Sequence, residues 1–117
     1  MKSDMPAKTN PLKLNPLQAK TLVLFQEMAR HPELSGPDPR GGVFLGQIPH
    51  PHGNHFHIGS KVVSSADATG FTNRSVWVAL ERKGLIRSAF PYALTLTDDG
   101  LAYDTGLDAT VLHDTDH

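Results

Sequence analysis

The sequence predicts one α+β domain in which helices pack against short antiparallel strands. The prediction rests on three stretches: a helical pattern at 15–30, a second at 72–83, and two strand patterns that directly follow Gly84. The 117 residues, 38% hydrophobic and 20% charged, suffice for one domain with a modest core. The absence of cysteine excludes disulfides and thiolate metal sites.

A first helix is expected over 15–30, because this stretch carries a start signal and a stop signal. Asn15 can cap the helix, Pro16 suits its first position, and Gln18 completes a capping box. Four positions at helical spacing follow, namely Leu17, Thr21, Leu24 and Met28. The helix should end at the next His-Pro pair. The lysine-bearing residues 1–14 before it are expected to form a mobile basic arm.

A strand is expected at 43–45, and a histidine-rich β-hairpin insertion at 47–59. Gly53-Asn54 is a favourable two-residue hairpin turn. Strand alternation would then place four histidines on one face, namely His50, His52, His55 and His57. Neutral imidazoles in this arrangement can bind zinc, nickel or copper. The alternative is an exposed insertion in which one or two rings pack on Phe56 and no metal binds.

The central helix is expected over 72–83. Thr72 or Asn73 can cap its start, and Gly84 tolerates the left-handed conformation that ends it. One helical face carries Val76, Leu80 and Lys83, with Ala79 beside them. The polar residues Arg74, Ser75 and Arg82 point elsewhere.

Two short strands should follow this helix, at 85–87 and 92–96, joined by a turn that contains Pro91. A short helix is then expected over 98–103. The negative charges of Asp98 and Asp99 would be favourable beside the partial positive charge at its N-terminus. These elements should share one core that includes Leu24, Val76, Leu80, Leu85 and Leu96.

This order of motifs resembles a winged helix-turn-helix domain, as found in MarR-like and related bacterial transcriptional regulators. Residues 80–86 read L-E-R-K-G-L-I and residues 96–100 read L-T-D-D-G, while 64–72 correspond to the second helix and its turn. The resemblance covers about 60–104. It implies a three-helix core with a β-wing over 15–104, followed by an acidic tail at 105–117.

The resemblance also implies a function, namely a regulator that binds double-stranded DNA. Its expected location is the cytoplasm, because the sequence shows neither a signal-peptide pattern nor a membrane-spanning run. The helix near 72–83 would enter the major groove, and the wing would touch the phosphate backbone. The first turn of that helix would meet the bases through Thr72, Asn73, Arg74 and Ser75. Asn73 can read adenine and Arg74 can read guanine by bidentate hydrogen bonding. The expected phosphate contacts are Lys61, Arg82 and Arg87.

Charge is distributed unevenly, although the net charge is only −1. Residues 1–97 contain all 11 Lys and Arg and 6 of the 12 Asp and Glu, whereas residues 98–117 contain the other six acids. A basic body with an acidic end suits a protein that meets DNA on one side. A tail that only improves solubility is the alternative. The N-terminus has no signal-peptide pattern, and no apolar run is long enough to cross a membrane.

Two further functional hypotheses remain open. The first is a winged-helix protein-interaction module, which an exposed Trp77 and Phe90 and a short central helix would favour. Trp77 is alternatively a core residue. The second is a metal-responsive regulator that uses the histidine hairpin. No catalytic motif is present, so no enzymatic activity is expected. The DNA sequence, the effector, the sign of regulation and the choice between monomer and homodimer stay open.

Overall fold

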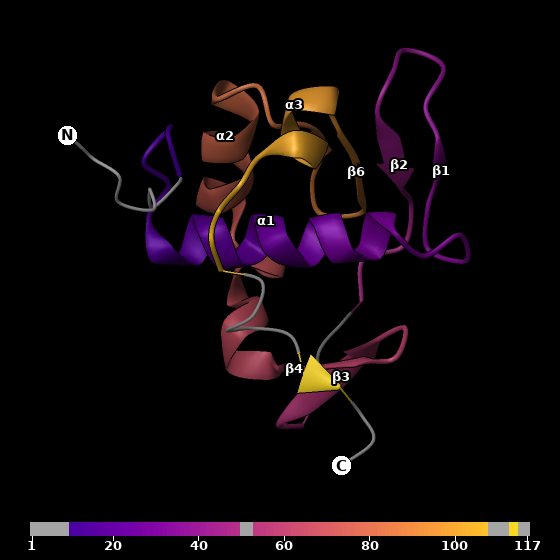
Figure 1. Cartoon of the computed structure of the whole chain (residues 1–117), viewed down its shortest axis with the longest axis vertical. Helices are drawn as coiled ribbons and strands as arrows, with labels where there is room; N and C mark the ends of the chain where they lie inside the picture. The colour runs from indigo at the N-terminus through magenta and orange to yellow at the C-terminus, as the bar shows by residue number, and fades with distance from the viewer. Residues whose placement is uncertain (1–9, 50–52, 108–112, 115–117) are drawn as a thin grey trace, which may run out of the picture.

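Helix α1 (Pro16–Ala29) runs across the middle of the computed structural model, with the other elements packed on both of its sides (Figure 1). The structure describes residues 10–49, 53–107 and 113–114. The remaining helices are η1 (Ser65–Thr72, a 3₁₀-helix), α2 (Arg74–Arg82) and α3 (Asp98–Ala102). The strands are β1 (Gly36–Pro37), β2 (Val43–Leu45), β3 (His55–Ile58), β4 (Lys61–Ser64), β5 (Ile86–Ala89), β6 (Ala93–Leu96) and β7 (His113–Asp114). The chain is therefore an α+β fold, as the sequence predicts.

The start of α1 confirms the predicted capping box. The Asn15 side chain accepts a hydrogen bond from the Gln18 amide at 2.8 Å, and the Gln18 side chain accepts one from the Asn15 amide at 3.0 Å. The helix is buried on most of its circumference, and Leu22, Leu24 and Phe25 are fully inaccessible to solvent. It therefore forms the centre of the core.

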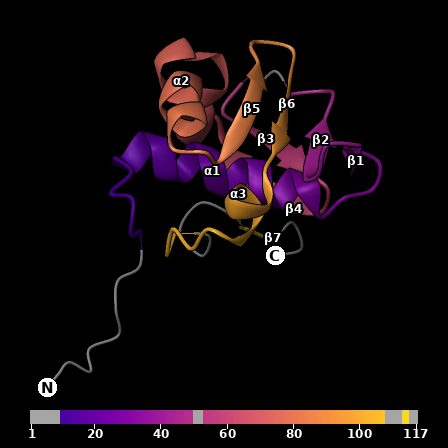
Figure 2. The ribbon, with the colours of Figure 1, turned by 90° about the horizontal axis from the view of Figure 1, so that it is seen from above.

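The larger sheet is antiparallel, with the strand order β1-β2-β6-β5. The hairpin of β5 and β6 is the predicted strand pair that follows the central helix. The predicted strand at 43–45 is also present as β2, and it pairs with the returning strand β6. Figure 2 shows this sheet and α2 side by side over α1.

The smaller sheet has the order β3-β4-β7, and it corrects the predicted histidine hairpin. Ile58 pairs with Lys61, so the turn that closes the hairpin is Gly59-Ser60 and not Gly53-Asn54. Gly59 has φ +59°, a conformation that favours glycine. The reason is burial: this pairing brings Phe56, Ile58 and Val63 into the core. Residues 46–49 form no strand.

The second helix of the expected three-helix core is the 3₁₀-helix η1, which lies unusually close to α1. A Cβ atom added to Gly70 would be 1.9 Å from the Thr21 hydroxyl oxygen, so only glycine fits there. The Trp77 indole N–H donates to the Gly70 carbonyl oxygen at 3.1 Å. This bond links η1 to α2.

The five predicted core residues belong to one hydrophobic cluster, which confirms that prediction. Aromatic rings extend the cluster: Phe25 is stacked on Phe71 at 5.5 Å and meets Trp77 edge-on at 5.4 Å. Trp77 is completely buried, which confirms its placement in the core and makes the hypothesis of an exposed tryptophan wrong. Trp77 is buried because it packs against other core side chains, among them Phe25.

Residues 10–14 pack against the end of the domain, although the sequence predicts a mobile arm over 1–14. The Leu12 amide donates to the Tyr103 hydroxyl at 2.8 Å, and that hydroxyl donates to the Asn10 side chain at 2.6 Å. Leu14 is buried. In the predicted tail, Thr105 is also buried, and β7 pairs with β4. None of the helices in the described ranges is long and apolar enough to span a membrane.

Candidate nucleic-acid interface

Helix α2 separates its residues into a buried face and an exposed face. The buried side chains are Val76, Trp77 and Leu80. The exposed side chains are Arg74, Ser75, Val78, Glu81 and Arg82. Lys83, expected at the edge of the core, instead lies exposed, and its ammonium donates to the Leu12 carbonyl oxygen at 3.2 Å. Most of the polar residues predicted to meet DNA therefore do face solvent.

The first turn of α2 contacts the turn of the β5–β6 hairpin. The guanidinium carbon of Arg74 lies 4.8 Å from the centre of the Phe90 ring. Phe90 in turn meets the buried Trp77 ring edge-on at 5.0 Å, so the Phe90 ring packs against the core. Tyr92, two residues further along the turn, is 79% exposed. Helix and hairpin thus form one continuous surface, which we call the helix–hairpin surface and define as Thr72, Arg74, Ser75, Val78, Arg82, Phe90 and Tyr92.

Glu81 is the acidic residue on the exposed face of α2, and it turns toward β5. Its carboxylate accepts a hydrogen bond from the Ser88 amide at 3.0 Å. The contact anchors the C-terminal end of α2 to strand β5. The negative charge of Glu81 therefore faces the backbone of β5. Arg74 and Arg82 lie eight residues apart, a little over two helical turns, and both are exposed.

Asn73 has a structural task that competes with base recognition. Its side-chain oxygen accepts the Ser75 amide at 3.0 Å and caps α2. A bidentate contact with adenine would need the same oxygen. The hydroxyl of the exposed Thr72 makes only a long contact of 3.5 Å, to the Thr69 carbonyl oxygen. Thr72, Arg74 and Ser75 are thus better placed than Asn73 to meet an external partner.

Arg87 points away from α2, across the outer side of the larger sheet. Its guanidinium donates to the Gly41 carbonyl oxygen and lies 3.5 Å from the Asp38 carboxylate. The hydrogen bond from Thr95, followed by that from the Arg40 amide, lowers the pKa of Asp38 to about 2, and the Arg40 and Arg87 charges contribute. This network is absent from the sequence predictions, because it joins a loop to strands distant in the chain.

Lys61 also lies apart from the helix–hairpin surface. It begins β4 in the smaller sheet, opposite Ile58 on one side and Asp114 on the other. Five of the seven predicted DNA-binding residues thus belong to α2 or its entry, namely Thr72, Asn73, Arg74, Ser75 and Arg82. Arg87 and Lys61 are not brought to the same place.

Of the predicted metal ligands, His55 and His57 are described, whereas His50 and His52 lie outside the described residues. Both described rings are exposed on one face of β3, with their centroids 5.8 Å apart. In the described part of the chain, no group of three or more His, Cys, Asp or Glu side chains is arranged to hold a metal ion. The four-histidine site stays a prediction.

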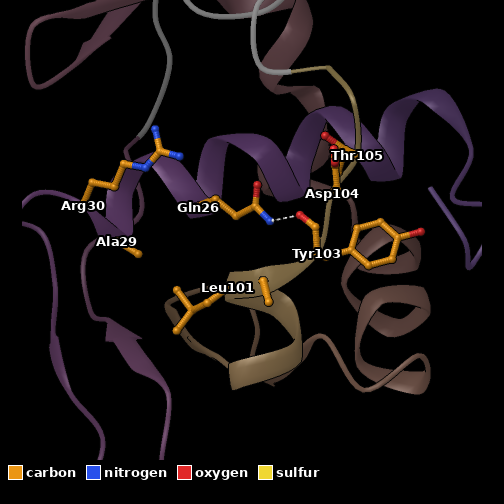
Figure 3. Close-up of a pocket in the computed structure, with 8 residues that line it drawn as sticks. Gln26, Ala29, Arg30, Leu101, Tyr103, Asp104 and Thr105 are labelled. Carbon is orange, nitrogen blue, oxygen red and sulfur yellow. Dashed lines mark hydrogen bonds between the residues drawn. The ribbon is translucent and has the colours of Figure 1, made fainter. Parts of the chain in front are cut away.

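A cavity of about 540 Å³ lies between α1 and the segment that starts in α3 (Figure 3). Its polar wall has structural partners. The Gln26 amide nitrogen donates to the carbonyl oxygens of Gly100 and Tyr103, both at 2.8 Å. Arg30 pairs with Glu27 at 3.1 Å. Gln26, labelled in Figure 3, therefore ties the C-terminal segment to α1.

A second cavity, about 390 Å³, adjoins the helix–hairpin surface. Its walls are mainly apolar, and they come from the end of η1, the turn of the β5–β6 hairpin and the segment after β2. The residues that line it are Gly46, Gln47, Ile48, Pro49, Phe71, Thr72, Pro91 and Tyr92. The exposed Tyr92 therefore borders both the helix–hairpin surface and an apolar hollow.

Comparison of the chain with protein-family models, curated proteins and solved structures finds no match.

Proposed function

We propose that the protein is a cytoplasmic, DNA-binding transcriptional regulator of the winged helix-turn-helix type. In this proposal α2 enters the major groove of double-stranded DNA, and the β5–β6 hairpin is the wing that flanks it. The observation that carries the proposal is the contact between Arg74 and Phe90. It makes the first turn of the helix and the turn of the hairpin one surface.

The order of elements supports the proposed fold type. Helix α1 forms the base, η1 precedes α2 with Asn73 between them, and the β5–β6 hairpin follows after a tight helix end at Gly84. Gly84 has φ +79°, as a helix-terminating glycine requires. The distribution of buried and exposed residues on α2 also agrees with a helix that rests on a core and offers its other face.

Different residues have different roles in this proposal. Arg74 would contact a base edge, because a guanidinium stacked on an aromatic ring keeps its in-plane N–H donors available. The hydroxyls of Thr72 and Ser75 would add contacts at the same helix end. Arg82 would bind a phosphate. Arg87 is left to its structural contacts with Asp38 and Gly41.

Fluorescence anisotropy with labelled duplexes at several salt concentrations tests the proposal. Random duplexes establish binding, and sequence selection from a pool supplies a preferred site. Arg74→Ala should lose about 1–3 kcal/mol of binding free energy for that site and relax its sequence preference. Arg82→Ala should weaken binding to all duplexes alike. It should also lower the slope of log affinity against log salt concentration by about one, as expected for the loss of one phosphate contact.

Arg40→Ala is the matched control, since Arg40 is exposed in the loop between β1 and β2, away from α2 (Figure 1). It should leave DNA binding close to that of the wild type. Wild-type protein that shows no salt-dependent binding to any duplex would rule the proposal out.

A protein-interaction module is the second candidate, and a specific observation favours it. Val78, in the middle of the exposed face of α2, is 37% exposed, and Tyr92 is 79% exposed beside the apolar cavity of about 390 Å³. Exposed apolar side chains next to a hollow are typical of protein contacts. Under this alternative, Val78→Asp would abolish partner binding, whereas Arg74→Ala and Arg82→Ala would have little effect.

A further inference from the structure

His55 and His57 are held on the same side of β3 by the burial of the residues that alternate with them. Phe56 and Ile58 enter the core, with 8% and 1% of their surfaces exposed, so both histidines must face solvent. The strand is fixed by its pairing with β4, in which His55 opposes Ser64 and His57 opposes Val62. The separation of the two imidazoles is therefore a property of a hydrogen-bonded strand, not of a loop.

We propose that His55 and His57 together bind one divalent transition-metal ion, Cu²⁺, Ni²⁺ or Zn²⁺, with water in the remaining positions. Neutral imidazole is a suitable ligand for all three ions. The site requires two histidines from the described strand, not the four of the predicted hairpin. It is independent of the proposed DNA binding.

The ring geometry is compatible with a shared ion. With a metal–nitrogen distance of about 2.0–2.1 Å, two imidazoles on one ion have centroids about 4.5–6.4 Å apart, depending on the angle between them. The observed centroid separation of 5.8 Å falls inside this range, and the rings are inclined at 74°. Rotation of the exposed rings about their side-chain torsions is enough to aim one nitrogen of each at a common point.

The surroundings indicate an open site of modest affinity. The described part of the chain adds no third His, Asp or Glu to the pair. In the proposal water completes the coordination, and affinity should follow the ordinary order for nitrogen ligands, with Cu²⁺ above Ni²⁺ and Zn²⁺. The β3–β4 hairpin lies across α1 from α2, so metal binding there can be measured without disturbing the helix–hairpin surface (Figure 1).

The test is calorimetric titration of the purified chain with Ni²⁺ and with Zn²⁺, and NMR of ¹⁵N-labelled protein during addition of Cu²⁺. We expect one ion per chain. Paramagnetic Cu²⁺ should first broaden the signals of His55 and His57 and their cross-strand neighbours Val62 and Ser64. Either His55→Ala or His57→Ala should remove saturable binding. Both side chains are exposed, so the unfolding transition of each variant should match that of the wild type.

Two controls make the assignment specific. The first control, His50→Ala/His52→Ala, removes the other histidines of the segment. The second, His113→Ala, removes a histidine of β7, which pairs with Val62 of β4 as His57 does from the other side. All three substitutions should leave the stoichiometry and affinity unchanged. The proposal is overturned if the wild type binds no metal, if binding survives in His55→Ala/His57→Ala or needs only one of the pair, or if either control variant abolishes it.

Discussion

The Thr95 hydroxyl donates a 2.6 Å hydrogen bond to the Asp38 carboxylate, which ties strand β6 to the loop between β1 and β2. The same carboxylate accepts the Arg40 amide at 2.8 Å and lies 3.5 Å from the Arg87 guanidinium. Thr95 is only 3% exposed, so its hydroxyl has little access to water. The loop is therefore held to β6 and β5 through one ionised side chain.

We predict that Thr95→Val makes the chain less stable near neutral pH, and that the difference shrinks in acid. The pKa of Asp38 is lowered from 3.8 to about 2, chiefly by the Thr95 hydrogen bond. Folding therefore favours the ionised carboxylate. Its stabilising effect is complete above the unfolded pKa, near 3.8, and is lost as the pH falls through about 2.

Urea unfolding of both proteins between pH 6 and pH 1.5 measures this effect. The gap between the two midpoints should be widest at pH 6 and close at the acid end. A carbon-detected NMR titration should find the pKa of Asp38 raised toward 3.8 in the variant. A gap that does not depend on pH would contradict the proposed role of the hydroxyl.

Gly70→Ala should destabilise the protein by about 1–3 kcal/mol, the usual range for overpacking a core. The added methyl group would be 1.9 Å from the Thr21 hydroxyl oxygen, so α1 and η1 would have to separate. Gly36→Ala is the control, because a Cβ there meets nothing within 4 Å, and it should change stability by less than about 0.5 kcal/mol.

Adding Thr21→Ala to Gly70→Ala tests the mechanism. The shorter side chain gives the new methyl group room, so the double variant should be more stable than the sum of the single effects predicts. Strict additivity in chemical denaturation would mean that the close approach is not the cause.

Leu80→Ala should cost about 2–5 kcal/mol of unfolding free energy, because Leu80 is completely buried in the shared core. Val78 is the natural comparison: it lies on the same helix but is 37% exposed, and Val78→Ala should have a much smaller effect. Urea unfolding followed by Trp77 fluorescence measures both. Similar losses in the two variants would contradict the assignment of the faces of α2.

Local signals in the sequence predicted the helices well. Asn15, Gln18 and Gly84 act within a few residues of their own positions, so the ends of α1 and α2 follow from short-range chemistry. Gly53 and Asn54 do form a turn, with Gly53 at φ +72°, but the strand pairing predicted across it is wrong for the opposite reason. The pairing of β3 depends on burying Phe56, Ile58 and Val63 in a core assembled from distant parts of the chain.

The candidate site was predictable only in part for the same physical reason. The exposed face of α2 follows from helical periodicity. The contact of Arg74 with the Phe90 ring and the attachment of Arg87 to Asp38 do not, because each pair comes from different elements that meet only in the folded chain. Asn73 satisfied two sequence patterns at once, those of a helix cap and of a base-reading residue. The structure shows the cap.

Phe90→Leu should weaken DNA binding only when Arg74 is present, if the ring holds that guanidinium in position for the groove. A cation–π contact at an exposed site is worth about 0.5–1 kcal/mol, which sets the expected loss of binding free energy. Leucine keeps an apolar side chain against Trp77, so the fold should survive, and urea unfolding checks this.

Anisotropy with the preferred duplex is then measured for Phe90→Leu, Arg74→Ala and the double variant. The double variant should bind like Arg74→Ala alone, because the ring then has no guanidinium to position. If Phe90→Leu costs as much in the Arg74→Ala background as in the wild type, the ring contributes to binding by another route, and the contact between helix and hairpin no longer supports the proposed function.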